Sequence, residues 1–163
     1  MTVETPTAQP RFRLRMRGER GAAAVEFAIV APLLFLLVFA IIDFGFGFHA
    51  WDATQNAARE GARVAATNST ASTITTRAED TAGFLSNPVV VTLECAPLVD
   101  PADPQSGNGP FGGCGAGASW SEGDLVRVTV EYDYDYMTPL PAFVGLGNTL
   151  HMTSVAETRF EGN

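Results

Sequence analysis

The stretch AAAVEFAIVAPLLFLLVFAII, residues 22–42, decides the fold of this 163-residue chain. Its 21 positions include one charged side chain, Glu26. About 20 apolar residues suffice for a helix to cross the hydrocarbon core of a bilayer. We therefore expect a transmembrane helix over residues 22–42.

Charge differs between the two sides of this stretch. The ten basic residues are all arginine, and half of them lie in residues 11–20, although the whole chain has a net charge of −8. The positive-inside rule places such an arginine cluster in the cytoplasm. We expect residues 1–21 to form a basic cytoplasmic leader and the chain after the span to be extracytoplasmic. The acidic balance gives no electrostatic basis for binding nucleic acid.

A secretory signal peptide is the alternative, because it also places a basic region before an apolar one. Its apolar region usually spans only about 7 to 15 residues. The best cleavage match, Val38-Phe39-Ala40, is followed by two more apolar residues, Ile41 and Ile42. The length of the stretch favours the membrane anchor.

Glu26 is costly within an apolar segment, so it either reaches the membrane surface or has a function. The segment Arg20-Gly21-Ala22-Ala23-Ala24-Val25-Glu26-Phe27 resembles the processing site of type IV pilin-like precursors. In these precursors a prepilin peptidase cuts after a glycine and leaves a glutamate at the fifth mature position. The resemblance implies cleavage after Gly21 and a new amine on Ala22, which pairs with Glu26 of a neighbouring subunit. Such an ion pair would offset the cost of the carboxylate and set the register between subunits.

The resemblance continues beyond the span. Ile41-Ile42-Asp43-Phe44-Gly45 and Gln55-Asn56-Ala57-Ala58-Arg59-Glu60-Gly61-Ala62-Arg63 are similar to the TadE-like family of tight-adherence (Tad, or Flp) pilus systems. The resemblance covers residues 18–66 well and the C-terminal part of the chain loosely. It implies a minor pilin-like protein, or pseudopilin, of the bacterial inner membrane that helps to assemble a Tad-type pilus or secretion apparatus used in adhesion. The implied partners are the membrane, a prepilin peptidase and other pilin-like subunits.

Residues 43–66 are expected to extend the helix beyond the membrane, because no Gly or Pro cluster interrupts them. Pro32 predicts a kink or local unwinding within the span. Small residues recur at every fourth position of the extension and allow another backbone to approach closely. This row packs either on the chain's own sheet or on a neighbouring subunit, and it consists of Ala53, Ala57, Gly61 and Ala65.

Aromatic residues cluster just beyond the span, at Phe44, Phe46, Phe48 and Trp51. An aromatic belt at the membrane interface explains them more simply than a binding site. His49 lies among them and the only other histidine is His151, so a metal site there is not expected.

Residues 67–163 are expected to form a small extracytoplasmic α+β domain. Polar residues 67–76 are expected to end or interrupt the helix, which residues 77–85 would resume. Strands are predicted at residues 89–95, 125–136 and about 150–160, from their alternation of apolar and polar side chains. An antiparallel sheet of about three strands would bury one face and leave the other in water.

Cys95 and Cys114 are the only cysteines, and an extracytoplasmic location makes a disulfide between them the default. Closing the Pro- and Gly-rich loop between them would contribute about 3 kcal/mol by restricting the unfolded chain. A redox-active pair is less favoured, because the spacing is far from Cys-x-x-Cys.

The sequence gives no indication of an enzyme. Glu131, Asp133 and Asp135 lie on one strand face, where a solvated surface is favoured over a Ca²⁺ site because no Asp/Gly loop accompanies them. The chain has no nucleophile motif, dinucleotide fingerprint or metal motif, so we expect no cofactor and no small-molecule substrate. The alternative function is an uncleaved single-pass membrane protein whose extracytoplasmic domain binds a ligand. An extracytoplasmic enzyme is the third and least favoured hypothesis.

Overall fold

The computed structural model describes residues 18–67, 70–103, 105–114 and 120–162, without the side chains of residues 18–20. Most of the predicted leader therefore lies outside the described residues. The chain divides into two compact units, Met1–Val38 and Phe39–Asn163, and each is described here by itself.

Helix α1 spans Gly18–Ala65 and contains Pro32. In the first unit, every described side chain of residues 21–38 is exposed except that of Ala31. The apolar part of α1 has a mean hydropathy of 2.8. The helix is thus long and apolar enough to cross a membrane.

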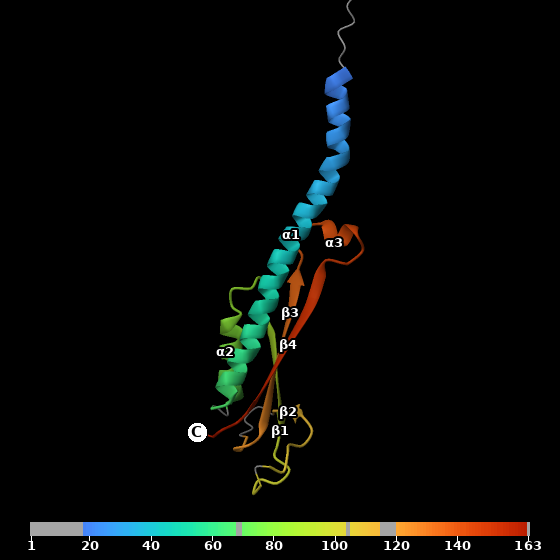
Figure 1. The fold of residues 1–163 in the computed structure, drawn as a ribbon. Coiled ribbons are helices and arrows are strands. Elements are labelled where there is room, and N and C mark those ends of the chain that lie inside the picture. Colours follow the sequence, from blue (N-terminus) through green and yellow to red (C-terminus); the bar gives the residue numbers. More distant parts are fainter. Residues whose placement is uncertain (1–17, 68–69, 104, 115–119, 163) are drawn as a thin grey trace, which may run out of the picture. The chain divides into compact units, whose positions relative to one another are not determined.

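The second unit contains a four-stranded antiparallel sheet in the order β2-β1-β3-β4 (Figure 1). Together with the long N-terminal helix, this sheet confirms the predicted α+β class. The three predicted strands correspond, with shifts of about one residue, to β1, β3 and β4. The additional strand, β2, holds only two glycines and offers no side-chain alternation to detect. The strands are β1 (Val90–Ala96), β2 (Gly112–Gly113), β3 (Leu125–Asp135) and β4 (Thr149–Arg159).

The central strand β3 pairs with β4 along its whole length, from Leu125 opposite Arg159 to Asp135 opposite Thr149. Alternate side chains from Val126 to Tyr134 are buried on one face, as the period of two residues predicts. This face forms the core of the second unit together with small residues of α1.

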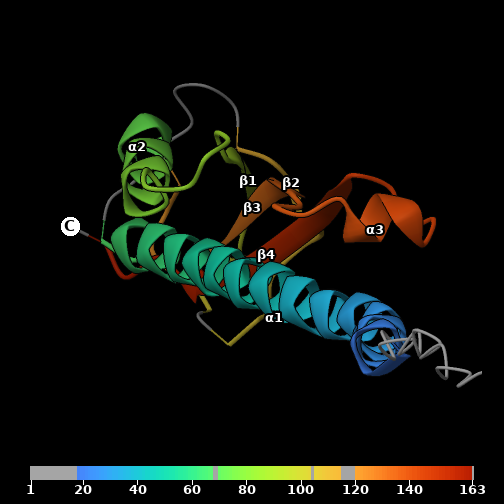
Figure 2. The ribbon, with the colours of Figure 1, turned by 90° about the horizontal axis from the view of Figure 1, so that it is seen from above.

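A second helix, α2 (Ala71–Thr81), lies beside the C-terminal part of α1 (Figures 1 and 2). The predicted interruption after residue 66 is confirmed, because α1 ends at Ala65. The predicted resumption at residue 77 was wrong, because the chain is helical again from Ala71. Ile74 and Ala78 lie four positions apart and are both fully buried in the core. Their burial outweighs the low helix propensity of the threonines around them.

A short helix, α3 (Leu140–Phe143), lies in the connection between β3 and β4 (Figure 1). It was not predicted, because its four residues are too few to show a helical period. The connection brings residues after β3 next to α1, as the hydrogen bonds of Asp43 show.

Candidate interaction sites on the anchor helix and the C-terminal domain

The predicted processing residues lie on the exposed surface of α1 in the first unit. Gly21, Ala22, Glu26 and Phe27 are all exposed. Among the described residues, no atom outside the local helix lies within 4 Å of a Cβ built at Gly21. Packing in the described part of the chain therefore does not require a glycine at this position.

Asp43 links α1 to the connection that follows β3. Its carboxylate is buried, and Oδ1 accepts hydrogen bonds from the backbone N–H groups of Met137 at 3.0 Å and Thr138 at 3.1 Å. The hydroxyl of Thr138 donates to Oδ2 of the same carboxylate. Sequence reasoning did not identify this role; the available signal was an acid placed directly after an apolar stretch.

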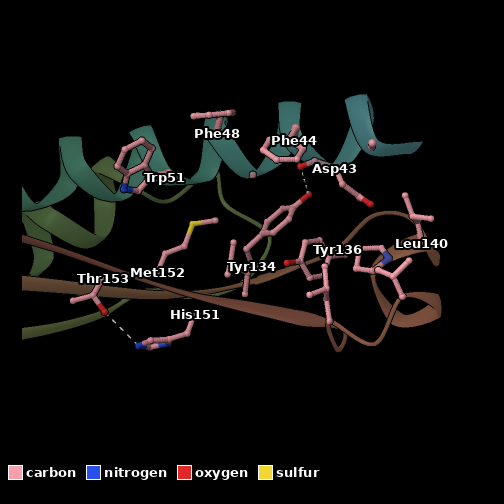
Figure 3. A pocket seen from close by; sticks show the side chains of 16 residues that line it. Asp43, Phe44, Phe48, Trp51, Tyr134, Tyr136, Leu140, His151, Met152 and Thr153 are labelled. Carbon is pink, nitrogen blue, oxygen red and sulfur yellow. Dashed lines mark hydrogen bonds between the residues drawn. The ribbon is translucent and has the colours of Figure 1, made fainter. Parts of the chain in front are cut away.

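Tyr134 strengthens the same junction from β3. Its hydroxyl donates to the backbone carbonyl of Asp43 at 3.5 Å (Figure 3). Burial raises the pKa of the Tyr134 hydroxyl, and the nearby Asp43 carboxylate raises it further. The ring of Tyr136 packs edge-on against that of Tyr134, with the centroids 5.6 Å apart.

A groove of about 580 Å³ opens beside this junction (Figure 3). Side chains of α1, of the ends of β3 and β4, and of the connection between them line it, and most are apolar. A groove of this composition suits an apolar group better than a charged substrate. The lining residues are Ala40, Asp43, Phe44, Gly47, Phe48, Trp51, Tyr134, Tyr136, Leu140, Pro141, Val144, Leu146, Leu150, His151, Met152 and Thr153.

The predicted aromatic belt is exposed on α1. Phe44, Phe48 and Trp51 follow one another along the helix with ring centroids 6.1 and 6.2 Å apart. All three also line the groove. His49 packs instead against the ring of Phe84, with centroids 5.2 Å apart.

The row of small residues on α1 faces the protein's own domain. Ala53, Ala57 and Ala65 are buried, and a Cβ at Gly61 would lie 3.0 Å from Cγ1 of Val128 and 3.3 Å from Cβ of Ala78. The sequence left open whether this row packs on the chain's own sheet or on a neighbouring subunit. In the described chain it packs on the sheet and on α2.

The polar side of this part of α1 holds α2 through Glu60. One carboxylate oxygen of Glu60, Oε1, accepts from Arg63 and from Arg77 of α2, each at 2.8 Å. These hydrogen bonds lower the pKa of Glu60 from its ordinary 4.5 to about 2. Nearby, Arg59 donates a hydrogen bond to Gln55 at 2.8 Å. Polar residues of the run 55–63, which carries part of the family resemblance, therefore bond to one another.

Cys95 and Cys114 form a disulfide, with their Cα atoms 5.3 Å apart. The loops beside it are also held by the buried carboxylate of Asp124. One oxygen of Asp124 accepts from the backbone N–H of Leu98 at 2.9 Å, and the other accepts from that of Ser121 at 2.8 Å. This end of the domain is thus fixed covalently and by buried hydrogen bonds.

Two of the three strand acids have polar partners on the exposed face of the sheet. Asp133 lies 2.8 Å from Nδ1 of His151, whose pKa it raises, and Asp135 accepts a hydrogen bond from Asn87 at 2.9 Å. In the part of the chain that the structure describes, no three His, Cys, Asp or Glu side chains gather to hold a metal.

These features define a class of protein with an N-terminal helix long and apolar enough to span a membrane, followed along the chain by a small α+β domain. Residues 21–63 match a family model described as TadE-like protein. The resemblance to the TadE-like family is confirmed over this stretch, which begins at Gly21 and includes Glu26 and Asp43. No curated protein and no solved structure matches the chain.

Proposed function

We propose that this chain is a minor pilin-like membrane protein that takes part in assembling a Tad-type pilus or secretion apparatus. The observation that carries the proposal is the TadE-like match over residues 21–63. That match contains both the apolar span and the positions expected for processing. The function then lies in helix packing and subunit register rather than in catalysis.

Processing after Gly21 by a prepilin peptidase is part of this proposal. The leader would lie in the cytoplasm, the span in the inner membrane and the C-terminal domain outside the cytoplasm. Cleavage would free the amine of Ala22, which then pairs with Glu26 of another pilin-like subunit. The argument is physical, because a carboxylate in hydrocarbon is costly without a partner of opposite charge.

Glu26→Gln tests the proposed register, because it removes the charge while keeping the size of the side chain. We expect a strain that carries only this variant to process the protein but to lose its pili, as a deletion strain does. Immunoblots of the mature form and counts of piliated cells measure the two effects. Glu79→Gln, a change at an exposed carboxyl on α2, is the matched control and should restore pili.

The outcomes separate the parts of the proposal. Normal piliation with Glu26→Gln would rule out its role in register. Normal piliation in the deletion strain itself would overturn the proposed function.

A second candidate function is an uncleaved single-pass membrane protein with a binding domain. The apolar groove of about 580 Å³ favours it, because a subunit that only packs against neighbours does not require such a groove. This candidate predicts a retained arginine-rich leader and normal function with Glu26→Gln.

A further inference from the structure

The connection between β3 and β4 has an unusual composition. Residues 136–148, here called the apolar loop, contain no charged residue in a chain whose net charge is −8. Four of its large apolar side chains are prominently exposed: Phe143 at 92 %, Leu146 at 67 %, Met137 at 64 % and Val144 at 58 %. Exposed apolar side chains that gather in this way mark an interaction surface.

The apolar loop lies beside the last turn of the apolar stretch of α1. Asp43, the first residue after that stretch, bonds to the start of the loop at Met137 and Thr138. Leu140, Val144 and Leu146 of the loop line the same groove as Ala40, a residue of the stretch itself. If residues 22–42 cross the bilayer, the loop is held at the depth of its interface.

The backbone of the apolar loop is suited to a poorly hydrated environment. The N–H groups of Phe143, Val144 and Leu146 donate to carbonyls within the loop, at 3.1, 3.1 and 2.8 Å. Two further positions, Pro139 and Pro141, have no N–H to satisfy. Backbone groups paired in this way reduce the cost of leaving water.

We propose that the apolar loop inserts into the membrane interface next to the span, so that the protein contacts the bilayer at a second point. The partner is lipid, at the boundary between headgroups and acyl chains. Lipid is favoured over a protein because it is already present at this depth, and because the loop offers no charge to recognise a polar partner. Phe44, Phe48 and Trp51 line the same groove, and aromatic side chains are enriched at this boundary.

Tryptophan quenching by brominated lipid tests the insertion. All variants are made in the full chain with Trp51→Phe, so that the buried Trp120 is a common background. Each protein is placed in phosphatidylcholine vesicles with bromine on the upper part of the acyl chains. One new tryptophan is then introduced per variant. Phe143→Trp probes the apolar loop, Phe35→Trp probes the span, and Val155→Trp probes an exposed site on β4. We expect the added emission of Phe143→Trp to fall by about half or more, and that of Val155→Trp to stay unchanged.

Equal, unquenched emission from Phe143→Trp and Val155→Trp would overturn the insertion. If Phe35→Trp is quenched in the same experiment, the membrane anchor stands and only the insertion fails. Emission from Phe143→Trp that is shifted to the blue but unaffected by bromine would indicate a protein partner and would also overturn it. The inference needs the span but not the processing at Gly21, so a failed cleavage test leaves it intact.

Discussion

Asp43 connects α1 to the segment after β3 within the second unit. Its carboxylate accepts three hydrogen bonds from Met137 and Thr138 while being shielded from water. An acid next to an apolar stretch would otherwise be expected to face the solvent. These hydrogen bonds give a structural reason for an acid at residue 43, which lies within the family match.

Asp43→Ala should loosen this junction. The change removes the acceptor of three part-buried hydrogen bonds from Met137 and Thr138, which costs about 1 to 2 kcal/mol in the free energy of unfolding. Hydrogen exchange of the full chain in detergent should become faster in residues 136–148. Asp52→Ala removes an exposed acid of the same helix and should leave this exchange unchanged. Unaltered exchange in Asp43→Ala would contradict the assigned role.

Glu60 predicts a pH dependence of stability. Its pKa is lowered to about 2 in the folded chain, from an ordinary 4.5, by Arg63 and Arg77. A lowered carboxyl pKa stabilises the fold above about 4.5, and that contribution is lost as the pH falls through about 2. The difference in melting temperature between the wild type and Glu60→Gln should therefore shrink from pH 5 to pH 2, by an amount limited by solvent screening.

Melting curves of the full chain in detergent measure this trend. Adding Arg77→Gln to both proteins should reduce the change of this melting-temperature difference with pH, because one of the two donors to Glu60 is removed. Arg59→Gln alters an arginine that bonds to Gln55 instead, and it should leave this pH dependence unchanged. If the melting temperatures of the wild type and Glu60→Gln differ by the same amount across this pH range, the ion-pair explanation is contradicted.

At the scale of elements, close packing of α1 on the sheet depends on Gly61. A Cβ there would approach Val128 at 3.0 Å, whereas a Cβ at Gly45 meets no described atom within 4 Å outside the local helix. Gly61→Leu should destabilise the fold by about 1 to 3 kcal/mol through overpacking. Gly45→Leu should instead stabilise the helix by up to about 1 kcal/mol. Chemical unfolding of both variants measures the contrast, and equal effects would contradict it.

The elements differ in how far the sequence predicts them. Strand β3 alternates buried side chains with half-buried or exposed ones over its whole length, so its residues and its buried face follow from the pattern. The row from Ala53 to Ala65 predicts a close approach but not its partner, because small residues suit both a sheet and another helix. Helix α2 was placed too late, because contacts that bury Ile74 and Ala78 are made with distant residues.

The candidate site was predicted in part. The pairing of Cys95 with Cys114 follows from there being two cysteines. Gly21 and Glu26 carry a recognisable local pattern, and processing there stays a prediction. The groove and the role of Asp43 were not foreseen, because they combine α1 with residues about 95 positions later in the chain. Such contacts depend on the register of β3 and β4, which no local pattern specifies.

At the scale of the whole molecule, the two units present different surfaces. The first exposes nearly all of its described apolar side chains, whereas the second has a buried core between the sheet and the helices. The second unit also exposes apolar side chains, notably in the aromatic belt and in the apolar loop. Side chains such as Phe27 and Leu33 require a bilayer or neighbouring helices around them. The proposed pilin-like role would provide both environments, the bilayer and neighbouring subunits.

The N-terminus of the membrane-extracted protein tests the central claim most directly. Intact mass and N-terminal sequencing would be compared with and without a co-expressed prepilin peptidase, whose activity is checked on a second precursor. Gly21→Val should block cleavage, and Gly18→Val is the matched control that should permit it. We predict a start at Ala22 that requires the peptidase. A start at Met1 despite an active peptidase, or a start at Ile41 as for a signal peptide, would contradict the proposal.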